Sequence, residues 1–579
     1  MSFANPIARL CALAGLLAAG AGHAELFTVG AADDQYGCTH TSIAAALQSA
    51  QLNGPGLDII IVTNGAAYTG QALRIASQSV EIRGGFSTCG LGADEFQPYA
   101  LINGNGTDPL LRIEPATAGE YEVTLIDLRL SGGGSPSVDG GAIQLSPGTL
   151  TYVTLELIQT ELSGNRANRG GGIYARRGPA PDGDYRVLLR NGTRILGNTA
   201  AGSGGGLNIN DSALHIESDN VRIANNTAGG AGGGIYLSNG TLLVGNPVAI
   251  PPRNDVNGAW VEGNSAGTLG GGILLIGSSA LMEARELIVD GNNAPAGGGI
   301  AATNGARLSL LRDAPADRAW YCPPAKECTR LSNNRAGDGV STGTRGGALA
   351  LYSGAVAELS QAIVRDNRAQ DAAAVLVDGA SVLRTEGVLF TGNRAVDISG
   401  QAGALIRASY QLPSAPPDLS LAYTTFVDNL RRGTDSIERA AIDLIGQSGT
   451  TLAVYSSAFL DSPYGWTMYS AHTSDCAVVR DGGGLPGTGT HTRSYTVPEI
   501  VNNNLFLRPG AANGWRPRFN SPLTDFCDSS AYAARYRDRD LRPRCRDEAK
   551  PNRFGTCDAG AFENDQLFAD DFADDPAAG

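Results

Sequence analysis

Residues 270–294 read GGGILLIGSSALMEARELIVDGNNA, and this stretch decides the fold. It holds three short apolar segments, at 272–277, 280–284 and 287–290, separated by a Ser-Ser turn and by the polar pair Arg285-Glu286. Segments of about five residues without a helical period of 3.6 predict strands. Three strands followed by a glycine-rich turn form a unit that cannot bury its apolar face alone, so neighbouring units must stack on it.

The unit recurs along the chain. The phrase Asn-x-Ala marks each copy, an apolar side chain lies three residues before each Asn, and a glycine cluster with a following aliphatic residue comes after most of them. The eight full copies begin at Asn165, Asn198, Asn226, Asn264, Asn292, Asn334, Asn367 and Asn393, with a degenerate ninth at Asn429. This repetition predicts an all-β fold, a right-handed parallel β-helix (a solenoid), over residues 57–460.

Identical positions in such a fold stack about 4.8 Å apart along the axis. We therefore expect the eight Asn side chains to form a structural ladder in which each amide bonds the amides above and below, from a left-handed turn position. The glycines would permit close approach of one coil to the next.

Both ends of the solenoid need a cap, because a terminal coil exposes unpaired backbone. Residues 25–56 predict an N-terminal cap: Thr41–Ala50 has a capping start and places Ile43, Leu47 and Ala50 on one helical face. Residues 461–563 predict a loop-rich, disulfide-containing C-terminal cap, and residues 564–579 an acidic flexible tail.

Residues 1–24 predict a signal peptide: Arg9 precedes a short apolar run, and Gly22-His23-Ala24 forms a small-x-small cleavage site. Removal of this segment leaves an even number of cysteines, which favours disulfides in an exported chain. We expect pairings that each close a loop within one cap or insertion: Cys38–Cys89, Cys322–Cys328, Cys476–Cys527 and Cys545–Cys557.

The formal net charge is −14, from 57 acidic and 43 basic residues, and nothing in the sequence forms the dense basic face that phosphate backbones attract, so nucleic acid is a poor partner. No segment of the mature chain reaches the about 18 uninterrupted apolar residues of a transmembrane helix. Together with the signal peptide, these features predict a secreted protein.

The repeat phrase resembles that of bacterial polymorphic outer-membrane proteins, in which G-G-[GA]-[IL] alternates with F-x-x-N. Phe390-Thr-Gly-Asn393 and Phe426-Val-Asp-Asn429 match the second element. The block from Cys38 to Ala46 and the segment Cys557–Glu563 resemble exported β-helix proteins of the choice-of-anchor type. The resemblance implies a β-helix displayed outside the cell, at the cell surface or outer membrane of a Gram-negative bacterium, and does not imply a particular activity.

The search for catalytic residues leaves the catalytic site unknown. No H-E-x-x-H motif occurs, and no pair of carboxylates lies on a repeat face, so we expect no metal and no cofactor. Arg365 with Asp366, or Arg394 with Asp397, could neighbour each other on stacked turns, although such pairs are usually solvated surface. His40, beside the predicted helix, is more often a neighbour of a cap than a base.

An exposed tryptophan can stack on a sugar ring, or it can cover the coil beneath its loop. Four tryptophans raise this question: Trp260, Trp320, Trp466 and Trp515. The sequence thus predicts a non-catalytic β-helix protein for adhesion or for contact with polysaccharide or cell-surface components. The alternative is a polysaccharide lyase or glycoside hydrolase with an unrecognised site.

Overall fold

The computed structural model describes residues 24–495 apart from positions 33, 35, 55, 65, 77, 91–98, 147–150, 178–183, 218–219, 246–257, 312–328, 338–342, 397–402, 411–413, 433–441, 446–449, 461–466, 469–471, 476 and 481–492. The predicted signal peptide, the acidic tail, most of the predicted C-terminal cap and the pairings Cys322–Cys328, Cys476–Cys527 and Cys545–Cys557 lie outside the described residues.

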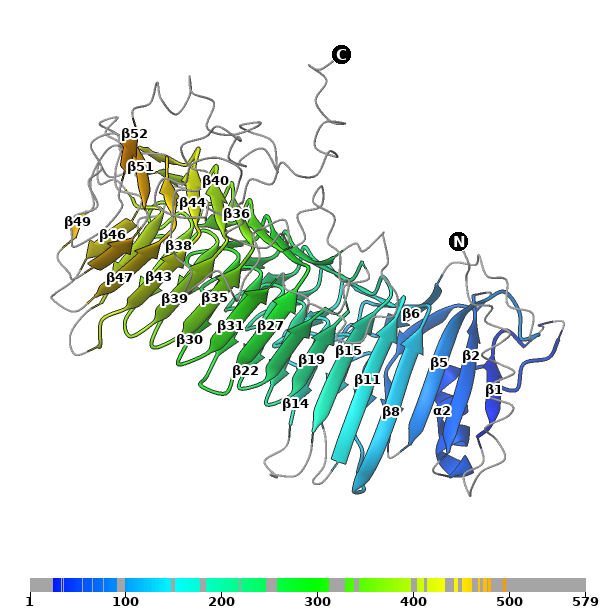
Figure 1. Cartoon of the computed structure of the whole chain (residues 1–579). Helices are drawn as coiled ribbons and strands as arrows, with labels where there is room; N and C mark the ends of the chain where they lie inside the picture. Colours follow the sequence, from blue (N-terminus) through cyan, green and yellow to red (C-terminus); the bar gives the residue numbers. More distant parts are fainter. Residues whose placement is uncertain are drawn as a thin grey trace, which may run out of the picture. The chain divides into compact units, whose positions relative to one another are not determined.

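The chain divides into two compact units, residues 1–198 and 199–579. Within each unit every adjacent pair of strands is parallel, and the strands belong to four sheets that we name A, B, C and D (Figure 1). The chain runs repeatedly from sheet C to A to B, and from β13 (Arg166–Ala167) onward also to D, so that a complete coil adds one strand to each sheet. The predicted parallel β-helix is confirmed.

In the first unit, the strands of sheet A are β1 (Leu26–Val29), β2 (Leu57–Thr63), β5 (Ser79–Phe86), β8 (Gly119–Ile126), β11 (Thr151–Ile158) and β15 (Tyr185–Arg190). Those of sheet B are β3 (Tyr68–Gln71), β6 (Ala100–Gly104), β9 (Leu128–Ser131), β12 (Glu161–Ser163) and β16 (Arg194–Leu196). Those of sheet C are β4 (Leu73–Ile75), β7 (Leu111–Ile113), β10 (Ile143–Leu145) and β14 (Ile173–Arg176), and sheet D contributes β13 (Arg166–Ala167).

In the second unit, the strands of sheet A are β19 (Ala213–Ile216), β23 (Thr241–Val244), β27 (Leu281–Arg285), β31 (Arg307–Leu311), β35 (Val356–Ser360), β39 (Val382–Glu386), β43 (Asp418–Ala422), β47 (Thr451–Tyr455) and β50 (His472–Asp475). Those of sheet B are β20 (Arg222–Ala224), β24 (Ala259–Glu262), β28 (Leu287–Asp290), β32 (Arg330–Ser332), β36 (Ile363–Arg365), β40 (Leu389–Thr391), β44 (Thr425–Val427), β48 (Ala458–Phe459), β51 (Val478–Arg480) and β52 (Arg493–Tyr495).

Sheet C of the second unit comprises β18 (Leu207–Asn210), β22 (Ile235–Ser238), β26 (Ile273–Ile276), β30 (Ile300–Thr303), β34 (Leu349–Leu351), β38 (Val375–Asp378), β42 (Ile406–Ser409), β46 (Ile442–Ile445) and β49 (Thr467–Met468). Sheet D comprises β17 (Thr199–Ala200), β21 (Thr227–Ala228), β25 (Ser265–Ala266), β29 (Asn293–Ala294), β33 (Arg335–Ala336), β37 (Arg368–Ala369), β41 (Arg394–Val396) and β45 (Leu430–Arg432).

The core consists of columns of apolar side chains in strict register. The residue after each glycine cluster faces inward: Ile235 pairs with Ile273, and Ile273 with Ile300, all with no exposed surface. The position three residues before each ladder Asn is likewise buried. Towards the C-terminal end this column becomes aromatic, and the rings of Phe390 and Phe426 stack with centroids 4.7 Å apart and an interplanar angle of 3°. Spacing between coils thus equals the stacking distance of aromatic rings.

The ladder asparagines are buried and joined to each other. In the first unit, Asn165 Nδ2 donates to Asn198 Oδ1 at 2.9 Å. In the second unit the same bond runs without a break from Asn226 through Asn264, Asn292, Asn334, Asn367 and Asn393 to Asn429.

The expected left-handed conformation of these asparagines is wrong. The residue with positive φ is the one before each ladder Asn, for example Asn333 (φ 54°), Asp366 (φ 55°) and Gly392 (φ 66°). The turn therefore lies at a surface residue in the left-handed conformation, which only Gly, Asn and Asp adopt at low energetic cost. The ladder Asn that follows turns its amide inward, along the stacking direction.

The N-terminal cap is built around helix α2 (Ile43–Asn53), whose capping residue Ser42 accepts a hydrogen bond from Ala45 N at 3.2 Å. Its apolar face buries Ile43 and Leu47 against the first strands, and it contacts β1, β2 and β4 (Figure 1). A disulfide joins Cys38, just before the helix, to Cys89, which follows β5. Among the described residues, no helix is long and apolar enough to cross a bilayer.

Candidate binding site

Three arginines line up on sheet D of the second unit. Arg335 in β33 pairs in register with Arg368 in β37, which pairs with Arg394 in β41. All three are exposed. Adjacent strands lie about 4.8 Å apart, so the three guanidinium groups start from backbone positions spread over about 10 Å. We call this set the arginine row.

The arginine row borders a surface hollow of about 280 Å³, whose lining also includes Asn333 and Asp366. These two residues occupy the left-handed turn position of successive coils. The next coil has Gly392 there, and a Cβ on this glycine would lie 2.5 Å from Asp366 Oδ1. The glycine therefore leaves room for the Asp366 side chain to reach over the neighbouring coil.

The floor behind the hollow is rigid. Asn334, Asn367 and Asn393 precede the three arginines directly, have no exposed surface, and bond one another along the ladder. The turn itself is held by Asn333, whose Nδ2 donates to Asp290 Oδ1 at 2.8 Å. In front of this floor the arginine row presents long, exposed side chains with forked hydrogen-bond donors.

The lining carries three guanidinium groups and one carboxylate, which leaves two net positive charges on a chain whose own net charge is −14. Asp366 Oδ2 lies 4.0 Å from Arg365 Nε. Among the described residues, neither Arg368 nor Arg394 forms a salt bridge. The predicted neighbours Arg365 and Asp366 thus do meet, and Arg394 lies in the same hollow as Asp366, whereas Asp397 lies outside the described residues.

This arrangement suits anion binding better than hydrolysis. Asp366 is the one carboxylate among the described residues that line the hollow, and glycoside hydrolysis ordinarily requires two. Arginine forks bind carboxylates and sulfates in a bidentate manner.

Trp260 does not offer a free face to a sugar. Its half-buried ring lies between the guanidinium groups of Arg222 and Arg330, each 5.3 Å from the ring centroid. Cation–π contacts of this kind hold the ring against its coil. Trp320, Trp466 and Trp515 lie outside the described residues.

His40 links the cap to the first coil. Its Nε2 lies 2.8 Å from Ser49 Oγ in α2 and its Nδ1 lies 2.9 Å from Thr39 Oγ1, while Phe27 packs edge-on against the ring. Thr39 Oγ1 in turn bonds the backbone of Thr28 in β1. These contacts give His40 a role in attaching the helix.

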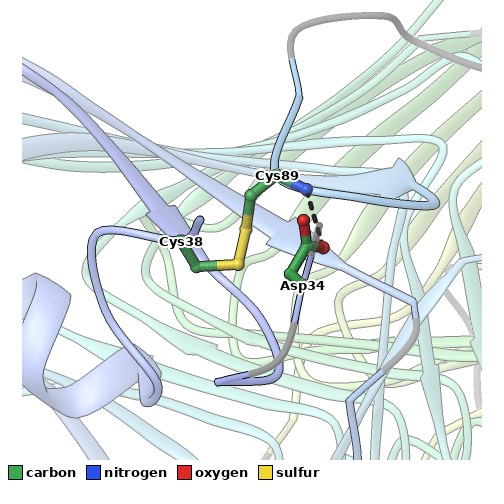
Figure 2. A group of neighbouring side chains, drawn as sticks. All are labelled: Asp34, Cys38 and Cys89. Atoms are coloured by element: carbon green, nitrogen blue, oxygen red, sulfur yellow. Dashed lines mark hydrogen bonds between the residues drawn. A yellow bond between two sulfur atoms is a disulfide. The ribbon is translucent and has the colours of Figure 1, made fainter. Parts of the chain in front are cut away.

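One group of potential metal ligands occurs among the described residues: Asp34, Cys38 and Cys89, whose ligand atoms lie within 4.8 Å of one another (Figure 2). Its two sulfur atoms are bonded to each other, so they are not thiolates and cannot bind a metal as such. Asp34 instead accepts a hydrogen bond from Cys89 N at 3.1 Å (Figure 2).

The most buried ion pair among the described residues has a structural role. Asp371, 8% exposed, bonds the backbone N–H groups of Ala372 and Ala404 and lies 2.7 Å from Arg407 Nη1. Burial raises the pKa of the Asp371 carboxyl, against the opposite effect of the neighbouring guanidinium groups. Its bonds join two successive coils beside the glycine turn.

Comparison with known proteins adds no functional assignment: no family model matches the chain, and no curated protein matches it. The sequence analysis missed Arg335 and Arg368, although a signal was present. Both fill the middle position of Asn-x-Ala, as Arg394 does, and that position is arginine in three successive copies.

Proposed function

We propose that this protein is a secreted or cell-surface β-helix protein that binds carbohydrate at the arginine row without catalysis, and that its biological role is adhesion. The observation that carries the proposal is the hollow bordered by Arg335, Arg368 and Arg394, exposed charges held on a rigid ladder. The predicted signal peptide supports export, and the resemblance to polymorphic outer-membrane and choice-of-anchor proteins supports display at the surface.

The solenoid suits this role because it presents the same turn position again and again along one line. A ligand that is itself a repeating polymer can then contact several coils at once, and several weak contacts add up through effective concentration. Mutation of the exposed middle position leaves the buried Asn and Ala on either side unchanged, so the binding surface and the fold are separable.

A polysaccharide lyase or glycoside hydrolase is the alternative. For such an enzyme, the hollow that holds the Asp366 carboxylate beside three arginines would be the candidate active site. The hollow offers no second carboxylate among the described residues, and for this reason we propose binding.

The two functions separate in one experiment. The purified mature chain is incubated with a panel of neutral and acidic polysaccharides, with and without calcium, and both retention on the polymer and release of unsaturated or reducing ends are measured. Retention without released ends supports a binding protein. Released ends would establish the enzyme, and neither retention nor release from any polymer would refute carbohydrate binding.

A further inference from the structure

We infer that the ligand of the arginine row is an acidic polysaccharide with carboxylate-bearing sugars, bound in an extended form along the row. This inference rests on the proposed function and adds the chemical class and the direction of the ligand.

The direction follows from the register. Arg335, Arg368 and Arg394 are Cα partners in successive strands of sheet D, so they advance along the stacking direction and not along a strand. Their spacing is that of the coils, about 4.8 Å. A linear chain of uronic acids carries one carboxylate on every ring, so it can place anions beside successive guanidinium groups when it lies parallel to the row.

The chemical class follows from the mixed lining. Asp366 lies among the cations, with a side chain 52% exposed. A carboxylate repels a ligand that presents only anions, but it accepts hydrogen bonds from hydroxyl groups. An acidic sugar supplies both anions for the arginines and hydroxyl donors for Asp366, and Asn333 adds a further polar contact on the same wall.

Other polymers fit less well. A neutral polysaccharide offers no anion to the two net positive charges of the lining. Single-stranded DNA presents phosphates to the arginines, but its internal sugars carry no free hydroxyl groups, so it gives Asp366 further negative charge and no sugar hydroxyl donor.

The test measures binding of size-selected alginate and polygalacturonate by calorimetry, with neutral dextran and a single-stranded DNA oligonucleotide as comparison ligands. The site variant is R335Q/R368Q/R394Q. The control R285Q/R307Q/R384Q removes the same number of charges from sheet A of the same unit. Thermal melting of both variants and the parent verifies that each remains folded.

We expect the parent and the control to bind the uronic acid polymers with affinities that fall as salt rises, because the contacts are ionic. The site variant should lose at least about 30-fold in affinity, since each bidentate arginine–carboxylate contact contributes several-fold or more. Asp366→Asn tests the contact with sugar hydroxyl groups. If Asp366 accepts hydrogen bonds from these groups, the variant should change the ratio of the affinities for alginate and polygalacturonate, whose hydroxyl configurations differ. If the site recognised charge alone, the variant would bind both polymers more tightly by the same factor.

Two results would overturn the inference while leaving carbohydrate binding intact: tighter binding of dextran than of the uronic acid polymers, or equal affinities of site and control variants for them. Tighter binding of the oligonucleotide would overturn it in favour of a nucleic-acid surface. Binding to none of the four ligands would count against the inference, and the wider polysaccharide panel decides the proposed function separately.

Discussion

The strongest stability prediction concerns the asparagine ladder, with Asn292→Ala as the perturbation. Asn292 lies in the middle of the second unit and has no exposed surface. Its Oδ1 accepts hydrogen bonds from Asn264 N at 2.9 Å and from Asn264 Nδ2 at 3.0 Å. Its Nδ2 donates to Val261 O at 2.8 Å and to Asn334 Oδ1 at 3.0 Å. Every donor and acceptor of the side chain is therefore used.

The expected loss in the free energy of unfolding follows from the buried polar groups that lose hydrogen bonds when Asn292 is replaced by alanine. The backbone N–H of Asn264 loses its acceptor, and Asn264 Nδ2 and Val261 O each lose one bond, all in a region that water does not reach. A buried polar group without a partner costs about 1–3 kcal/mol, so the variant should lose about 3 kcal/mol or more. Ser265→Ala, next to the preceding ladder residue, is the matched control and should lose less than about 0.5 kcal/mol.

The assay is urea unfolding of the mature chain followed by circular dichroism, with the two variants and the parent in parallel. An unfolding midpoint for Asn292→Ala equal to that of Ser265→Ala would refute the role assigned to the ladder. Asn292→Asp separates hydrogen bonding from packing, because it keeps the shape but replaces two N–H donors with a buried carboxylate oxygen. It should destabilise at neutral pH at least as strongly as alanine, and a near-normal midpoint there would show that shape alone matters.

Three further changes test other parts of the structure. Ala372 has φ +52° and no exposed surface at a position where other coils have glycine; Ala372→Gly should raise the free energy of unfolding by about 0.5–1 kcal/mol, and a lower urea midpoint would contradict this. Burial raises the pKa of the half-buried Asp127 carboxyl, so the folded state holds its proton to higher pH than the unfolded state and stability falls as pH rises through the folded pKa. Asp127→Asn should therefore melt higher than the parent at pH 7 and equally at pH 3; a constant difference across this range would refute the assignment. Replacement of Cys38 and Cys89 by serine should destabilise the first unit by about 2–4 kcal/mol and leave polysaccharide binding unchanged, whereas unaltered melting would show that this crosslink contributes nothing.

The sequence could predict the fold because the constraints of a solenoid repeat at every coil. Apolar residues before each Asn, the Asn itself, and the aliphatic residue after each glycine cluster all face the interior, and each must match the coil above and below. An unsuitable side chain at one of these positions would disturb its own coil and both neighbours. The pattern is therefore repeated closely enough for the fold to be predicted from it. The backbone conformation at the turn was not readable in this way. The left-handed residue is Gly at some coils and Asn or Asp at others, as in Gly291, Asn333 and Asp366. The shared backbone conformation is therefore not marked by one residue type in the sequence.

The candidate site was harder to predict for a related reason. The interior positions are determined by stacking, whereas the middle residue of Asn-x-Ala points outward and is free to vary: it is Thr227 in one coil, Ser265 in the next and Arg335 further along. A residue at such a position carries no structural signal, and only its recurrence in successive coils distinguishes a surface from a collection of solvated side chains. The run of Arg335, Arg368 and Arg394 is recurrence of this kind, since stacking would accept threonine or serine at each of them. Like charges on adjacent strands destabilise the sheet slightly, and the acidic ligand that we propose for the arginine row would neutralise these charges.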